Sequence, residues 1–188
     1  RRPLAAGARF TVRVRYRSGP RRAGRAWIAT PEGSVTAAQP DGAHEIFPSN
    51  DHPADLATFT IRANTPAAST FVANGERVSR RTRRGRTAWV YRMRQPMATE
   101  LIQLAFGRLR VRDRGVHAGV HLRDVVAPRA ARELEPTLAR VRQHLDYMVA
   151  NAGPYPFAGY GSLVTDAPLN FALESQSLSL FGRALDAR

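Results

Sequence analysis

The spacing of the apolar residues changes once along this chain, near Val126, and this change constrains the fold more than any other feature. Before it, short segments alternate apolar and polar residues, which is typical of strands with one buried face. After it, apolar residues recur at the spacing of an amphipathic helix. The sequence therefore predicts a β-rich N-terminal domain over residues 1–125, incomplete at its start, and a second unit over residues 126–188 that opens with a helix.

Several stretches carry the strand pattern. Phe10–Arg17 alternates without a break, and Thr58–Arg62 repeats the alternation. Trp89, Tyr91 and Met93 define a third apolar face, and we favour a further strand over Leu101–Val111, entered through Met97–Thr99. Asn74-Gly75 follows Phe71-Val72 and is a typical hairpin turn. These patterns predict an antiparallel β region.

The helical stripe consists of Leu134, Leu138, Val141, Leu145 and Met148, and it predicts a helix over residues 128–151. Pro136 would kink this helix or mark its true start, because proline lacks the N–H that a helix interior needs. Gly153 and Pro154 end it, with glycine in the position after the last helical residue. The short apolar stretch Ser162–Val164 then predicts a strand.

The chain is strongly basic, with a formal net charge of +14 over 188 residues, and all 29 of its basic residues are arginine. A phosphate backbone accepts lysine and arginine alike, so the exclusion of lysine indicates biased codon usage rather than selection for a polyanion. The arginine cluster from Arg77 to Arg94 includes Trp89 and Tyr91, a combination that can bind single-stranded nucleic acid. We favour a solvated hairpin loop for it.

The residues by themselves predict no catalytic or metal-binding set in this chain. The absence of cysteine excludes disulfides and thiolate chemistry and is compatible with both secretion and the cytoplasm. No apolar run is long enough to span a membrane. His117 and His121 have the spacing of a helical zinc motif, but Ala118 stands where a catalytic glutamate is required. On a strand the two histidines would lie about 13 Å apart, too far for one metal ion.

A series of short motifs covers nearly the whole chain. Gln39 stands shortly before a Phe-Pro-x-x-Asp-x-Pro turn at residues 47–53. The motifs that follow are Asn74-Gly75, Pro96-Met97-Ala98-Thr99-Glu100-Leu101, Phe106-Gly107-Arg108, Gly153–Phe157 and Phe171-Ala172-Leu173-Glu174-Ser175. In this order they resemble the M1-family zinc aminopeptidases, which include aminopeptidase N, and the last is similar to the Gly-x-Met-Glu-Asn exopeptidase motif of that family.

The resemblance implies an antiparallel β-saddle or sandwich domain followed by the start of a thermolysin-like catalytic domain, mainly β with a C-terminal α/β portion. It implies that Gln39 and Glu174 hold the α-ammonium of a peptide, and that the backbone of Phe171, Ala172 and Leu173 lines the substrate. Phe171, Leu173 and Ser175 depart from the family's glycine, methionine and asparagine. The side-chain preference of the family therefore does not carry over.

The family's zinc ligands lie beyond the exopeptidase motif, and this chain ends at Arg188. The resemblance thus implies the N-terminal part of an enzyme that removes N-terminal residues from peptides, truncated before its zinc-binding motif. Zinc belongs to the parent enzyme, and the chain alone is predicted to be inactive. The expected partners are peptide substrates and the remainder of the catalytic domain, with no nucleic acid and no membrane span. The alternatives are a non-catalytic scaffold of the same fold and an arginine-rich nucleic-acid-binding domain.

Overall fold

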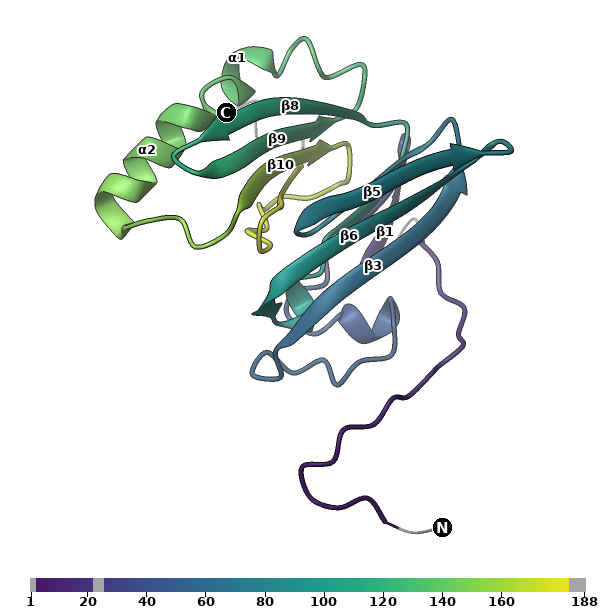
Figure 1. The fold of residues 1–188 in the computed structure, drawn as a ribbon. Helices are drawn as coiled ribbons and strands as arrows, with labels where there is room; N and C mark the ends of the chain where they lie inside the picture. Colours follow the sequence, from purple (N-terminus) through teal and green to yellow (C-terminus); the bar gives the residue numbers. More distant parts are fainter. Residues whose placement is uncertain (1–2, 22–25, 183–188) are drawn as a thin grey trace.

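The computed structural model describes residues 3–21 and 26–182, which form three β-sheets and two helices (Figure 1). In spatial order, the first sheet contains β1 (Trp27–Thr30), β2 (Gly33–Thr36), β7 (Leu104–Gly107) and β4 (Thr70–Ala73). The second contains β3 (Ala57–Pro66), β6 (Arg86–Met97) and β5 (Glu76–Arg83). The third contains β11 (Ser179–Gly182), β10 (Gly159–Thr165), β9 (Val120–Val126) and β8 (Arg110–His117). The helices are α1 (Glu135–Leu138) and α2 (Val141–Ala152), and two 3-10 turns are η1 (Ala43–Glu45) and η2 (Thr99–Leu101).

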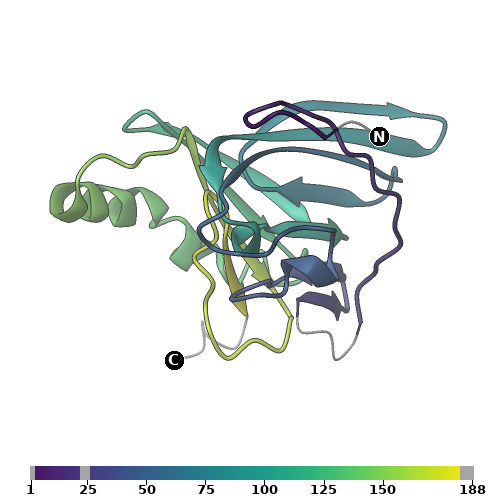
Figure 2. The ribbon, with the colours of Figure 1, turned by 90° about the horizontal axis from the view of Figure 1, so that it is seen from below.

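The mainly antiparallel β architecture that the sequence predicts is confirmed in the first two sheets. The third sheet is mixed: β8 and β9 form an antiparallel hairpin, whereas β10 pairs in parallel with both β9 and β11. Parallel neighbours need a long crossover, and the one from β9 to β10 carries α1 and α2. Figures 1 and 2 both show these helices on the side of the third sheet away from the second sheet.

The division expected at residue 125 falls inside β9, which ends at Val126. Because β9 pairs with β10 from the far side of that division, one sheet runs across it. The two-domain assignment stays a prediction.

The main core lies where the three sheets meet. Its buried residues include Val35 and Phe71 from the first sheet, Trp89 and Tyr91 from the second, and Leu163 from the third. The apolar face predicted for β6 is therefore confirmed. The polar tips of the aromatic side chains are satisfied, since Trp89 Nε1 donates to Thr65 Oγ1 at 3.0 Å and the Tyr91 hydroxyl donates to the Phe71 carbonyl at 3.1 Å.

The strand predicted over Phe10–Arg17 is wrong. Residues 3–20 form no strand, and the four apolar side chains of the segment, Phe10, Val12, Val14 and Tyr16, are all mostly exposed. Figure 1 shows the segment running away from the sheets. The alternation defines two faces, but a strand also needs a neighbouring backbone to complete its hydrogen bonds, and none of the described strands pairs with this segment. The strand predicted over Thr58–Arg62 is confirmed as part of β3, which pairs with β6.

The hairpin predicted at Asn74-Gly75 is also wrong, because β4 pairs with β7 whereas β5 pairs with β6. The turn instead carries the chain from the first sheet into the second. Gly75 has a φ of 76°, and a Cβ there would overlap the backbone carbonyl of Arg92, so glycine is required on both grounds. The hairpin of this region joins β5 to β6 through Arg84-Gly85, so much of the arginine cluster lies on an exposed strand rather than in a loop.

The single helix predicted over residues 128–151 is wrong in its first half. Turns occupy the residues up to Leu134, α1 begins at Glu135, and α2 begins after Arg140. Pro136 stands in the first turn of α1, where a missing N–H costs nothing, so it marks the true start. Gly153 ends α2 with a φ of 88°, as predicted. The strand predicted over 101–111 is divided among η2, β7 and β8, and the one at 162–164 is confirmed as β10.

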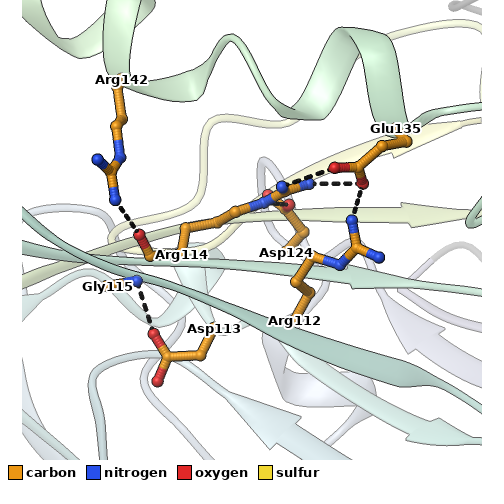
Figure 3. A network of polar contacts seen from close by, with 7 residues as sticks. All are labelled: Arg112, Asp113, Arg114, Gly115, Asp124, Glu135 and Arg142. Atoms are coloured by element: carbon orange, nitrogen blue, oxygen red, sulfur yellow. Dashed lines mark hydrogen bonds and ion pairs between the residues drawn. The ribbon is translucent and has the colours of Figure 1, made fainter.

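Four charged side chains fasten α1 to the third sheet (Figure 3). We call this group the ionic cluster; it comprises Arg112 and Arg114 of β8, Asp124 of β9 and Glu135 of α1. Arg114 donates to both carboxylate oxygens of Glu135 at 2.9 Å and also pairs with Asp124, while Arg112 pairs with Glu135. The hydrogen bond to Glu135 raises the pKa of Arg114, and burial raises the pKa of Asp124. Arg142 of α2 donates to the Arg114 carbonyl at 2.7 Å, so the second helix is also attached to the third sheet.

Candidate functional site

Glu174 lies in the connection between β10 and β11, and its side chain is exposed. It stands on the wall of a groove of about 550 Å³. From the helices the groove is lined by Leu138, Val141, Leu145 and Met148. From the chain that leads into β10 it is lined by Tyr155 and Phe157, and from β10 itself by Tyr160. An ionisable carboxylate at an apolar groove is a typical arrangement in a ligand site, because the few polar groups there fix the orientation of the ligand.

Gln39 lies three residues after the end of β2 at Thr36 and is exposed. Its peptide bond to Pro40 is cis, and the chain then turns into η1. The structure thus leaves the side chains of both residues expected to hold a peptide amine, Gln39 and Glu174, accessible at the surface.

A buried group of uncharged side chains connects the segments of these two residues. We call it the neutral cluster; it comprises Thr36, Asn74, Gln103, Ser175 and Ser177. Gln103 is completely buried at its centre. Its Nε2 donates to the Thr36 carbonyl at 2.8 Å, and its Oε1 accepts from Ser175 Oγ at 3.3 Å. Since Thr36 precedes Gln39 at the end of β2 and Ser175 directly follows Glu174, Gln103 holds the two segments together.

Asn74 is the second centre of the neutral cluster. Its Oδ1 accepts from the Gln103 backbone N–H at 2.6 Å, and its Nδ2 donates to the carbonyls of Leu101 at 3.0 Å and Gln176 at 2.7 Å. The next N–H, that of Gly75, donates to Ser177 Oγ at 2.7 Å. Hydrogen bonds between uncharged groups therefore fix residues 175–177 to the first sheet and to the turn that follows β4. No sequence motif points to Gln103, and the only signal of its role is an amide that stands between the apolar residues Ile102 and Leu104.

The three residues whose backbone is expected to line the substrate differ in how far their side chains are exposed. Phe171 is exposed and Ala172 is half-buried, whereas Leu173 is buried. The N–H of Leu173 donates to the Leu180 carbonyl at 2.9 Å, and its carbonyl accepts from the Leu180 N–H at 2.8 Å. Both backbone polar groups of Leu173 are thus engaged by β11. Substrate lining by the three residues remains a prediction.

Asp51 organises the loop that follows Gln39. Its Oδ2 accepts from the backbone N–H of His44 at 3.0 Å and contacts His44 Nδ1 at 2.6 Å, and its Oδ1 accepts from Thr99 Oγ1 at 3.1 Å. The hydrogen bond with Asp51 raises the pKa of His44. Burial opposes a low pKa at Asp51, but the hydrogen bonds from His44 and Thr99 hold its pKa below the ordinary value. This aspartate therefore ties η1 to η2.

Zinc does not fit the described residues. Among residues 3–21 and 26–182, no group of three or more histidine, aspartate or glutamate side chains could hold a metal ion. His117 Nε2 lies 2.6 Å from Asp146 Oδ1, and His121 Nε2 lies 2.9 Å from Asp113 Oδ1, so each histidine has its own carboxylate partner. We therefore derive no catalytic step from a metal on these residues.

None of the helices described is long and apolar enough to cross a membrane.

Comparison with known proteins gives the site a family context. Residues 29–101 match the sequence profile of the peptidase M1 N-terminal domain. A mutant of the M1 zinc metallopeptidase from Deinococcus radiodurans bound to a Tyr-Ser-Ala substrate is 28% identical, with a TM-score of 0.70 over 87% of this chain and 38% of that one. A two-domain M1 zinc metallopeptidase mutant bound to L-tryptophan is 29% identical, with a TM-score of 0.76 over the same shares. No curated protein sequence matches the chain.

The fold, the profile match and these structures together point to the M1 peptidases. Residues 29–101 carry the sequence pattern of the M1 N-terminal domain, and the fold of the chain is similar to part of the M1 zinc metallopeptidases. The chain spans a little over a third of the length of the solved structures it matches, 37% for the first of them.

Proposed function

We propose that this chain is the substrate-anchoring N-terminal part of a zinc-dependent aminopeptidase, which removes N-terminal residues from peptides. The match of residues 29–101 to the M1 N-terminal domain, and the similarity of the fold to M1 zinc metallopeptidases, support peptide hydrolysis as the activity of the whole protein. The zinc named in the matching structures supports zinc as its cofactor, with ligands outside the described residues. We further propose that the third sheet, together with α1 and α2, opens a thermolysin-like catalytic domain.

In this proposal Glu174 and Gln39 bind the α-ammonium of the peptide. The Glu174 carboxylate accepts a charge-assisted hydrogen bond from the ammonium, and the Gln39 amide oxygen is a second acceptor. Anchoring the ammonium fixes which peptide bond reaches the reacting centre, and positioning of this kind lowers the barrier substantially. The observation that carries the proposal is the exposed Glu174 on the apolar groove, held to the Gln39 segment through Gln103.

The groove supports a second part of the proposal, that the remainder of the catalytic domain packs against α2 and β10. Met148 continues the apolar stripe of α2 but is largely exposed, and it lines the groove beside Leu145. An apolar stripe that is buried at one end and open at the other is typical of a surface completed by another part of the protein.

Peptide titrations of the chain, followed by NMR, test the anchoring role. We expect a tripeptide with a free amine to bind at least tenfold more tightly than its N-acetylated form, because acetylation removes the charge that Glu174 accepts. The Glu174→Gln variant should bind both forms equally. The matched control Glu45→Gln removes another exposed carboxylate, on η1, and should keep the preference. Equal binding of both peptides by the native chain would refute the anchoring role.

An activity assay tests the placement of the zinc. The purified chain with added zinc should show no turnover of an aminoacyl-anilide above background. Turnover that is lost on chelation would show that the chain holds its own zinc site, contrary to the proposal.

A further inference from the structure

A second cavity, of about 400 Å³, lies between the second and third sheets and shares no lining residue with the groove of Glu174. Arg77 of β5, Tyr91 of β6 and Arg123 of β9 line it, together with Asp113 and His121. Two arginine side chains from different sheets thus line one open cavity.

Arg123 is an unusual residue for the interior, because only 9% of it is exposed and it has no carboxylate partner among the described residues. Its Nη2 donates to the carbonyls of Ala73 at 2.8 Å and Gly75 at 3.2 Å, and its guanidinium carbon lies 5.5 Å from the ring centroid of Tyr91. Carbonyl dipoles and an aromatic face offset only part of the cost of burying a full charge. Burial accordingly lowers the pKa of Arg123.

Arg77 is an exposed residue of β5 and lines the same cavity as Tyr91 and Arg123. Burial raises the pKa of the Tyr91 hydroxyl, and the charges of Arg123 and Arg77 oppose this rise. The Gly115 N–H at 2.8 Å and His121 at 2.9 Å bind Asp113 Oδ1 and lower the pKa of Asp113, and the charge of Arg77 lowers it further. Among the described residues, however, no ion pair joins Asp113 to Arg77 or Arg123. Glu76, the other acidic lining residue, is exposed.

We propose that this cavity binds an oxyanion, held by the guanidinium groups of Arg123 and Arg77 beside the Tyr91 hydroxyl. The planar fork of a guanidinium donates two parallel hydrogen bonds to a carboxylate or a phosphate, and an oxyanion supplies the counter-charge that Arg123 lacks. The same chemistry can come from inorganic phosphate or from the C-terminal carboxylate of a peptide. The site does not depend on the anchoring role of Glu174.

Calorimetric titration of the whole chain with inorganic phosphate, at an ionic strength held constant with NaCl, tests the site. We expect saturable binding that weakens at least tenfold in Arg77→Gln. The control Arg80→Gln lies on the same strand, stacks over Trp89 at 5.1 Å and does not line the cavity, so it should bind as the native chain does. Two further variants are Arg123→Lys, which keeps the charge but loses the planar guanidinium fork, and Tyr91→Phe, which keeps the ring but loses the hydroxyl. If one of these variants fails to fold, the others still test the site.

Competition then separates the two sources. An N-acetylated tripeptide with a free C-terminus should displace phosphate if the natural ligand is a peptide carboxylate, whereas its C-terminal amide should not. Phosphate binding without displacement by either peptide supports a free inorganic anion. Equal phosphate binding by the native chain and Arg77→Gln, or no saturable binding of either probe, would overturn the proposal.

Discussion

The ionic cluster and the neutral cluster do the same work with opposite chemistry. Each holds together segments that are distant in the sequence, the first joining β8 and β9 to α1, the second joining the ends of β2, β4 and β7 to residues 175–177. Within the ionic cluster, side-chain exposure rises from 1% at the buried Asp124 to 53% at Arg112. Gln103 and Asn74 are fully buried. Full desolvation is tolerable for amides whose hydrogen bonds are all made, whereas charges need either partners or a route to water.

The largest effect that we expect comes from Arg114→Ala, which would leave Asp124 buried without its cation. Removing one partner of a buried pair costs about 3–5 kcal/mol of unfolding free energy. Chemical denaturation measures this loss. The control Arg110→Ala lies on the same strand, is exposed and belongs to no ion pair of the described residues, so it should cost less than about 0.5 kcal/mol. Similar losses for both arginines would remove the distinction between the ionic cluster and ordinary surface charge.

Gly75→Ala should have the next largest effect, because it moves the turn that carries Asn74 into the neutral cluster. Gly75 and Gly85 both have positive φ angles, 76° and 70°, but a Cβ at Gly85 would meet nothing nearby. Gly85→Ala should therefore cost about 1–2 kcal/mol for backbone conformation alone. Gly75→Ala should cost about 1–3 kcal/mol more, for the overlap with Arg92. Equal melting temperatures of the two variants would contradict the close packing at this turn.

Gln103→Met tests the neutral cluster itself. Methionine keeps the length of the side chain but leaves the Thr36 carbonyl and the Ser175 hydroxyl without their partner, at a cost of about 1–3 kcal/mol. The loss should not change with salt concentration, because no charge is involved. NMR shifts of residues 174–177 should move, whereas the exposed control Gln143→Met should leave both stability and these shifts unchanged. A salt-dependent loss would mean that charges contribute to this cluster.

The smallest effect concerns a pair outside both clusters, the exposed His44 and the largely buried carboxylate of Asp51. The raised pKa of folded His44 means that its contribution is complete below about pH 6.5 and is lost as the pH rises through the folded value. The lowered pKa of Asp51 means that its contribution is complete above about pH 4 and is lost as the pH falls. The stability difference between the native chain and His44→Gln should therefore peak between these limits and vanish at alkaline pH. A difference independent of pH would exclude the ion pair.

Local patterns predicted which residues are buried better than they predicted which strands pair. The alternation in β6 correctly identified Trp89, Tyr91 and Met93 as core residues, since burial follows directly from the period. The same alternation in Phe10–Arg17 gave no strand, and Asn74-Gly75 gave no hairpin. Pairing depends on which backbone lies alongside, and this is a tertiary property that a short segment does not contain.

The candidate site was predictable only through family motifs. Gln39 and Glu174 were predicted from resemblance, and the structure leaves both exposed. Gln103 and Arg123 could not be predicted, because a buried amide or guanidinium is tolerable only where particular carbonyls surround it, and Thr36, Ala73 and Gly75 lie far from them in the sequence.

The crossover between β9 and β10 also determines the order in which the chain can fold. The β5–β6 and β8–β9 hairpins close over short loops and can form as soon as their own residues are available. The parallel pairing of β9 with β10 must wait until α1, α2 and all of β10 have been synthesised, and it pays the entropy of closing the whole connection. Until then one edge of β9 has no strand partner, and its backbone N–H and C=O groups stay open beside apolar side chains such as Leu122 and Val125. During synthesis, this edge can pair with another chain, which is a route to aggregation.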